Sequence, residues 1–166
     1  EYRLSLLIGC VSFFGLRISD LLTLTWSMLL DNEKFVITEQ KTGKRREIRV
    51  NCNFQKHIAD CYKSLGVVDK NEKCFLSRKR TVYSTQRINV LFKSMKSKYN
   101  LKIEHFSTHS MRKTFGRQVV EAAGENSEFA LRKLSELFNH ADIQTTRRYL
   151  GLRSQELLET YDMLNF

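Results

Sequence analysis

Four residues in the last third of the chain have the types and spacing for acid–base and nucleophilic chemistry. His109 and Arg112 lie three residues apart, so on a helix they share one face. His140 and Tyr149 follow, nine residues apart. Arg offers a fixed fork of donors to phosphate oxygens, His exchanges protons near neutral pH, and an activated Tyr is a covalent nucleophile. This set is suited to chemistry on a phosphodiester.

Each of these residues also has a simpler structural interpretation. A His-x-x-Arg pair is common on helix surfaces, and a Tyr near the end of a helix more often packs than attacks a substrate. Tyr161 is the alternative nucleophile, but its apolar neighbours Leu157, Leu158 and Leu164 favour packing. The catalytic interpretation therefore depends on the elements upstream.

The charge of the chain favours a polyanionic partner. Among 166 residues, 28 Lys and Arg stand against 18 Asp and Glu, which gives a formal net charge of +10. Such an excess indicates nucleic acid first and an acidic membrane surface second. The length suits one domain with a substantial core, and no linker, repeat or low-complexity tract interrupts it.

Cysteine and carboxylate spacing argues against a metal site. Cys10, Cys52, Cys61 and Cys74 form no C-x-x-C pair, and we interpret them as reduced thiols of a reducing compartment. No paired Asp/Glu cluster is visible, which disfavours a metal-dependent nuclease. No apolar run approaches the roughly 18 residues of a membrane span.

Hydrophobic spacing predicts a mainly helical chain with one change of period. Helices are expected over about 4–14, 20–24, 53–65, 84–99, 107–123, 127–138, 142–149 and 155–164. Their expected N-caps are Ser19 or Asp20, Asn53, Ser107 or Thr108, Ser127, Asp142 and Ser154. Arg17 then lies in the tight connection between Gly15 and the second helix, with Asp20 close enough to hold its guanidinium.

Residues 34–50 alternate with period two, which predicts a β-hairpin. Phe35, Ile37 and Glu39 alternate with Val36 and Thr38, and Gly43 supplies the turn. The tip carries K-T-G-K, residues 41–44. Two interpretations remain open: an edge hairpin protected by lysines, or a phosphate-contacting finger with one reactive Lys.

Four pieces of the chain, in order, resemble the motifs of the tyrosine recombinase (phage integrase) family. They are G-L-R-I-S-D-L-L-T-L-T-W around Arg17, K-T-G-K-R from Lys41, H-S-M-R-K-T-F from His109, and L-F-N-H-A-D-I-Q-T-T-R-R-Y ending at Tyr149. The resemblance covers about Leu4 to Leu152. It implies the catalytic-domain fold of that family, mainly α with a small antiparallel hairpin. It also implies a single catalytic domain over 1–166, and we expect the family's N-terminal DNA-gripping domain to lie outside this sequence.

The resemblance implies a role for each motif residue. Tyr149 would attack the scissile phosphate and form a 3′-phosphotyrosyl link, while Arg17 and Arg112 bind the non-bridging oxygens. His109 would be the general base, Lys41 would protonate the leaving 5′-oxygen, and His140 would donate a hydrogen bond to the phosphate. Asp20 would orient Arg17. Because the link stores the bond energy, no cofactor or metal is expected.

The implied partner is double-stranded DNA. Its expected contacts are Lys44, Arg45, Arg46, Arg80 and Arg87. Self-association into a tetramer on DNA is expected through the C-terminal helix 154–164, with no membrane partner. The implied setting is the cytoplasm of a bacterium and recombination or integration of a mobile genetic element.

Three departures from the family pattern keep other functions open. Phe138-Asn139 stands where Leu-Gly is frequent, Lys113 where His is frequent, and Leu150-Gly151 where small polar residues and His are frequent. One alternative is a DNA-binding module with impaired catalysis. Another is a type IB topoisomerase-like enzyme, which relaxes DNA by the same chemistry.

Overall fold

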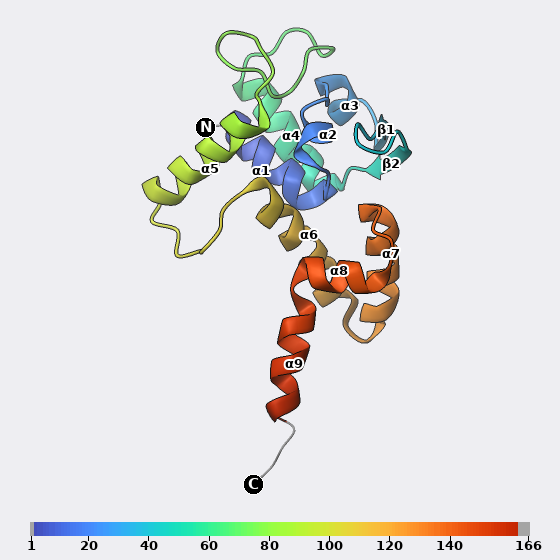
Figure 1. The fold of residues 1–166 in the computed structure, drawn as a ribbon. Coiled ribbons are helices and arrows are strands. Elements are labelled where there is room, and N and C mark those ends of the chain that lie inside the picture. The colour runs from blue at the N-terminus through green and yellow to red at the C-terminus, as the bar shows by residue number, and fades with distance from the viewer. Residues whose placement is uncertain (1, 163–166) are drawn as a thin grey trace. The chain divides into compact units, whose positions relative to one another are not determined.

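A computed structural model describes residues 2–162, without the side chains of 153–157 (Figure 1). The described chain is mainly helical with one two-stranded sheet, which confirms the predicted fold class. The elements are α1 (Tyr2–Phe14), α2 (Ile18–Leu21), α3 (Trp26–Leu30), β1 (Lys34–Thr38), β2 (Arg45–Arg49), α4 (Cys52–Ser64), α5 (Thr85–Lys98), α6 (Thr108–Ala123), the 3-10 turn η1 (Gly124–Asn126), α7 (Ser127–Phe138), α8 (Ile143–Leu150) and α9 (Leu152–Asp162).

The chain divides into two compact units, Glu1–Arg112 and Lys113–Phe166, called here the first and second unit. Each has a hydrophobic core of its own. The single catalytic domain expected over 1–166 stays a prediction. None of the helices in the described part of the chain is long and apolar enough to cross a membrane.

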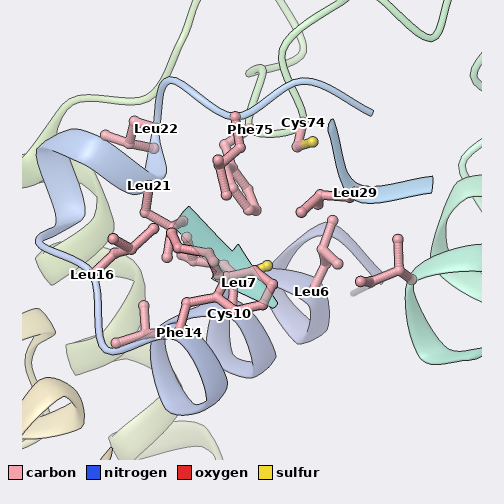
Figure 2. Packing of buried hydrophobic residues seen from close by; sticks show 14 of the residues in the cluster. Leu6, Leu7, Cys10, Phe14, Leu16, Leu21, Leu22, Leu29, Cys74 and Phe75 are labelled. Carbon is pink, nitrogen blue, oxygen red and sulfur yellow. The ribbon is translucent and has the colours of Figure 1, made fainter. Parts of the chain in front are cut away.

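The core of the first unit forms around α1. Leu6, Leu7, Cys10 and Phe14 are buried at helical spacing along it. Figure 2 shows these side chains facing residues from α2, α3 and the loop before α5, among them Phe75. Aromatic rings extend this core, because Phe14 packs edge-on against rings from both β1 and α4. α1 and the connection after it are thus anchored on several sides.

The hairpin has the period that the sequence predicts. β1 and β2 pair antiparallel, with Phe35 opposite Ile48 and Ile37 opposite Arg46. Phe35, Ile37 and Ile48 are buried in the core of the first unit. The Glu39 N–H donates to the Lys44 carbonyl at 2.9 Å, and the Gly43 N–H donates to the Glu39 carbonyl at 2.8 Å. These bonds define a four-residue tip over 40–43, with Gly43 at φ 67°.

The core of the second unit is small. Among the described residues it consists of four buried side chains: Leu131, Leu134, Phe138 and Leu150. Gly116 of α6 lies against them, because a Cβ placed there would be 2.5 Å from Leu150 Cδ2. The absence of a side chain at this position permits the close approach of α6 and α8.

Several predicted helix starts are wrong by a few residues. α4 begins after Asn51, whose side chain accepts from the Asn53 N–H at 2.8 Å, so the cap precedes the predicted Asn53. Ser127 is the first residue of α7, and Ser154 lies inside α9. Polar residues are frequent both at N-caps and in first turns, so residue type alone did not distinguish the two positions. Ser84 and Asp142 cap α5 and α8; the latter confirms the prediction.

The short second helix also differs from its prediction. α2 runs over Ile18–Leu21 and is preceded by Arg17 rather than capped by Ser19 or Asp20. Leu24 lies outside it, and the chain enters α3, which was not predicted, with Thr25 as its cap.

The C-terminal helix exposes two large apolar side chains among those described. Leu158 and Tyr161 of α9 are 68% and 74% exposed, so neither is buried within the described chain, and packing of Tyr161 against another subunit stays a prediction. The predicted helix over 155–164 is observed as Leu152–Asp162. The side chain of Leu157, and Leu164 as a whole, lie outside the described residues.

Candidate active site

Arg17 occupies the tight connection between α1 and α2, as the sequence predicts. Gly15 turns the chain at φ 57°, a left-handed conformation that favours Gly. Arg17 follows with an extended backbone, φ −67° and ψ 148°, and its carbonyl accepts from the Leu21 N–H at 3.0 Å. It is therefore the N-cap residue of α2. Its side chain is only 21% exposed.

The carboxylate bound by Arg17 is Glu39 and not the predicted Asp20. Arg17 Nη1 lies 2.9 Å from Glu39 Oε2, and the Glu39 side chain is buried. Asp20 is also buried, but its Oδ1 accepts from the backbone N–H of Gln40 at 2.8 Å. The prediction for Asp20 is corrected. The Asp20 carboxylate holds the hairpin tip through Gln40, and the Glu39 carboxylate binds the Arg17 guanidinium.

Arg46 is held inside the protein rather than displayed on the hairpin. Its Nη2 donates to the Phe14 carbonyl at 2.8 Å, and its Nη1 lies 3.8 Å from Glu39 Oε1. Burial lowers the pKa of the Arg46 guanidinium, an effect that nearby Glu39 opposes. Arg46 thus supports the C-terminal end of α1, and this contact counts against its predicted role at DNA.

The other predicted DNA contacts lie on the surface of the first unit. Lys44 and Arg45 are exposed on the hairpin, and Arg87 is exposed in the first turn of α5. Arg80 is exposed as well, and it pairs with Glu72 at 2.5 Å. Their contacts with DNA stay predictions.

Lys41 lies at the hairpin tip, exposed to solvent. The residue before it is bound to Asp20 through its backbone, and Thr42 after it donates its hydroxyl to Glu39 Oε2 at 2.8 Å. The backbone that carries Lys41 is therefore restrained on both sides.

His109 and Arg112 share the start of α6, as their spacing predicts. The Ser107 hydroxyl accepts from the Ser110 N–H at 3.2 Å, which confirms Ser107 as the cap, and the Thr108 N–H donates to Asn89 of α5 at 3.2 Å. His109 is exposed, whereas Arg112 is buried at 7% exposure. The first unit thus carries four of the predicted catalytic residues: Arg17 and Arg112, half-buried and buried, Lys41 on a restrained tip, and the exposed His109.

His140 follows α7 in a helix-ending motif that fixes its backbone. The His140 N–H donates to the Ser135 carbonyl at 3.0 Å, and the Asn139 N–H donates to the Glu136 carbonyl at 3.1 Å. Asn139 adopts the left-handed conformation, φ 56° and ψ 45°. This pattern is the Schellman motif.

The side chain of His140 is fixed by α8 of the same unit. His140 Nδ1 lies 2.9 Å from the hydroxyl oxygen of Thr146, which is completely buried. Tyr149 is half-buried one turn further along α8, and its ring meets the His140 ring edge-on with centroids 5.2 Å apart. The Lys113 ammonium lies 5.4 Å from the centre of the Tyr149 ring. His140 and Tyr149 are thus brought together within the second unit.

A metal centre has no ligand set among the side chains that the structure describes. No group of three His, Cys, Asp or Glu residues there could hold a metal ion. Three of the four cysteines are buried, and desolvation raises the pKa of the Cys10, Cys61 and Cys74 thiols. These thiols pack in the first unit and are poor nucleophiles.

Comparison with known proteins decides the family. The phage integrase family model matches residues 1–156. The chain belongs to the phage integrase family of tyrosine recombinases.

Its relatives in this family include proteins named tyrosine recombinase XerC and XerD. The chain is 27% identical over 148 residues to tyrosine recombinase XerC of Xanthomonas campestris pv. campestris, covering 89% of this chain and 44% of XerC. It is 31% identical over 171 residues to tyrosine recombinase XerD of Rickettsia bellii, covering 93% of this chain and 53% of XerD. The chain therefore spans about half the length of the curated relatives it matches.

Solved structures of tyrosine recombinases share its fold. The XerA recombinase matches with a TM-score of 0.73 at 20% identity, over 100% of this chain and 60% of that one. A lambda integrase dimer bound to a COC′ core site matches with a TM-score of 0.65 at 18% identity, over 89% and 42%. These matches confirm the predicted catalytic-domain fold.

One departure of this chain from its family pattern has a physical explanation. Asn139 stands where Gly is frequent, and the position requires positive φ. Asn is the residue after Gly that adopts this conformation most readily. The motif that presents His140 is therefore retained despite the substitution.

Two residues that contact candidate site residues were missed from sequence. Glu39 falls on the buried face of the hairpin, in alternation with Phe35 and Ile37, and a carboxylate on a buried face needs a cationic partner. The alternation in the sequence could therefore have identified Glu39. Thr146 carried no comparable signal, because a Thr in a short helix more often faces solvent.

Proposed function

We propose that the protein containing this chain is a site-specific DNA recombinase that cuts and rejoins strands through a 3′-phosphotyrosyl intermediate on Tyr149. The observation that carries the proposal is the pairing of Tyr149 with His140, whose ring is held by buried Thr146. A phenol beside an oriented imidazole, in a chain of this family, is the arrangement of a nucleophile and a phosphate-binding group.

In the proposed reaction the phenol oxygen of Tyr149 attacks the scissile phosphorus. The bond from phosphorus to the 5′-oxygen breaks, and a 3′-phosphotyrosyl link and a free 5′-hydroxyl result. His109 accepts the phenolic proton, and Lys41 supplies the proton that the leaving oxygen takes up. Attack by a 5′-hydroxyl of another strand reverses these steps, so the number of phosphodiester bonds is conserved without an external energy source.

Arg17, Arg112 and His140 stabilise the charge that develops on the non-bridging oxygens. The guanidinium groups are suited to this because they remain charged and present planar pairs of donors. Removing one such group raises the barrier by about 3 kcal/mol, as for a lost oxyanion donor. The binding of Arg17 to Glu39 keeps its guanidinium oriented before substrate arrives.

The proposed partner is double-stranded DNA, bound by Lys44, Arg45, Arg80 and Arg87. The formal charge of +10 supports it, as does the DNA present in related structures of XerH and lambda integrase. We also propose assembly of four protomers on DNA through α9, whose Leu158 and Tyr161 are exposed. The setting proposed is the cytoplasm of a bacterium, with a mobile element as the recombining DNA.

Covalent trapping tests the proposal. The full-length protein is incubated in EDTA with a nicked duplex of its candidate site, so that the cut fragment diffuses away and the intermediate accumulates. We expect a protein–DNA band on a denaturing gel that Tyr149→Phe lacks. Tyr161→Phe is the matched control, because it removes a phenol that is exposed in the same unit, and it should keep the band.

Other outcomes would change the assignment. A band lost with Tyr161→Phe and kept with Tyr149→Phe would move the nucleophile to α9. A wild-type protein that binds the duplex without cutting it would indicate a DNA-binding module. Relaxation of supercoiled DNA without site preference would indicate a topoisomerase.

A further inference from the structure

The hairpin tip that carries Lys41 is bound to two buried carboxylates. Gln40 donates its backbone N–H to Asp20 Oδ1 at 2.8 Å, and Thr42 donates its hydroxyl to Glu39 Oε2 at 2.8 Å. These two residues flank Lys41 directly. The tip is therefore restrained by side chains as well as by the hairpin hydrogen bonds.

Glu39 connects this tip to Arg17. The same oxygen, Oε2, accepts from Thr42 and from Arg17 Nη1, the latter at 2.9 Å. The other oxygen, Oε1, lies 3.8 Å from Arg46 Nη1. Because Arg46 also donates to the Phe14 carbonyl, the carboxylate is tied to the end of α1, to the start of α2 and to the tip.

Burial of this carboxylate is costly, which indicates that it is retained for geometry. Glu39 is only 2% exposed, and desolvating a carboxylate and a guanidinium can exceed what their attraction returns. Replacing a buried ion pair by well-packed hydrophobic residues is often neutral or stabilising. A charged network instead holds each partner at a defined position and orientation.

We propose that Glu39 is a positioning residue, which sets the Arg17 guanidinium and the Lys41-bearing tip in one arrangement around the scissile phosphate. This inference rests on the proposed function. Arg17 would contact a non-bridging oxygen and Lys41 the leaving oxygen of the same phosphate. A single carboxylate between them fixes the distance between two groups that must act together.

Glu39→Gln should slow cleavage by about 100-fold, which is the effect of displacing reacting groups by about 1 Å. Gln has nearly the same size, but its amide nitrogen is a donor and its oxygen is neutral. The arginine and the hydroxyl that now share one charged oxygen would face either a neutral oxygen or an amide donor. Binding of the duplex should change little, because Glu39 does not face solvent.

Substrate analogues distinguish positioning from a general loss of structure. A methylphosphonate at the scissile position removes one charged non-bridging oxygen, so cleavage depends less on Arg17. A 5′-bridging sulfur leaves as a stable thiolate, since thiols are far more acidic than alcohols, so cleavage depends less on Lys41. We expect the ratio of variant to wild-type rate to recover on each analogue.

Each outcome of this comparison is decisive. Recovery on both analogues supports the proposal. Recovery on the methylphosphonate alone confines the role of Glu39 to Arg17, and recovery on the bridging sulfur alone confines it to Lys41. Either result overturns the proposal that Glu39 positions both groups. An equal loss on the ordinary duplex and both analogues shows a merely structural role and overturns the proposal.

Two further variants serve as controls. Glu47→Gln makes the same chemical change on the same hairpin, where Glu47 is 61% exposed and pairs with Lys34 at 3.2 Å, and its rates should equal wild type. Thr42→Val removes one hydrogen bond from Glu39 at an exposed position. It should give a smaller loss with the same dependence on analogue, so it tests the proposal even if Glu39→Gln fails to fold.

The wild-type protein distinguishes a failure of the proposed function from a failure of the proposed role of Glu39. If it forms no covalent product on any of the three duplexes, the proposed function fails and the inference fails with it. If it cuts the ordinary duplex and Glu39→Gln cuts equally fast, the proposed function stands and only the inference is overturned.

Discussion

The two units hold their candidate catalytic groups by different means. In the first unit, Arg17 and the hairpin tip are bound to the buried carboxylates Glu39 and Asp20. In the second unit, His140 is bound to a neutral hydroxyl, and Tyr149 lies among aromatic rings. The first unit also has a large core, whereas the second has four buried core side chains among the described residues.

This difference fits what each group must do. A guanidinium stays charged throughout, so a carboxylate can orient it without changing its state. An imidazole beside a carboxylate would be biased toward its protonated form, whereas a Thr hydroxyl orients His140 without adding charge. The comparison teaches that this chain orients Arg17 through a charged carboxylate and His140 through a neutral hydroxyl.

The largest expected effect is on the small core of the second unit. Phe138→Ala removes a buried ring that contacts the rings of His140 and Tyr149, at a cost of about 3–5 kcal/mol. We expect hydrogen-exchange protection to be lost over 113–162 and retained over 1–112. Phe92→Ala, in the larger core, is the control and should leave the second unit protected. Simultaneous loss over both ranges in either variant would show that the chain unfolds as one cooperative unit.

A smaller effect is expected where a glycine lets two helices approach closely in each unit. Gly116→Ala would place a methyl group 2.5 Å from Leu150 Cδ2, and such overpacking costs about 1–3 kcal/mol, partly offset by the helix propensity of Ala. Gly9→Ala makes the same change against the Phe54 ring in the first unit. We expect both to lower the midpoint of urea unfolding, and only Gly116→Ala to slow covalent trapping strongly. Equal trapping by the two variants would argue against a link between α8 packing and the nucleophile.

The contact between His140 and the Thr146 hydroxyl should have a measurable effect on the cleavage rate. Thr146→Val keeps the shape of the buried side chain and removes the hydroxyl near Nδ1. Since one hydrogen bond contributes about 0.5–1.5 kcal/mol, cleavage should slow by about 2- to 10-fold, and Thr146→Ser should restore most of it. Single-turnover cleavage rates measure this. A Ser variant as slow as Val would assign the effect to packing of the methyl group.

The smallest expected effect is on the stability of the first turn of α8, which should depend on pH. The backbone N–H of Thr145 donates to Asp142, which lowers the pKa of that carboxyl. A lowered folded-state pKa stabilises the fold above the unfolded pKa of about 3.9, and this contribution is lost as pH falls through the folded value. Asp142→Asn, which can cap without titrating, should make exchange of the α8 amides less dependent on acid pH. Identical pH profiles for the two proteins would contradict this.

The local sequence pattern was sufficient to predict much of the secondary structure of this molecule. The alternation over 34–50 predicted the hairpin, and Gly15 and Gly43 predicted two of the turns that lie at positive φ. Asp142 was recognised as the cap of α8 because the bond from Thr145 is made within one helical turn. The predicted N-caps Asn53 and Ser127 were wrong, because the nearby polar residues Asn51 and Asn126 occupy the cap positions instead.

Sequence by itself determined the residue types, the order of the motifs and the family, because these depend on spacing along the chain. Only the tertiary structure decided which carboxylate binds Arg17, since Glu39 is 22 residues away and reaches it through the hairpin, while Asp20 is nearer in sequence but bound to Gln40. It likewise decided that Arg46 supports α1 and that Thr146 holds His140. The physical reason is that a buried charge or hydroxyl is paired with whatever group folding brings within about 3 Å, and proximity in sequence does not specify that group.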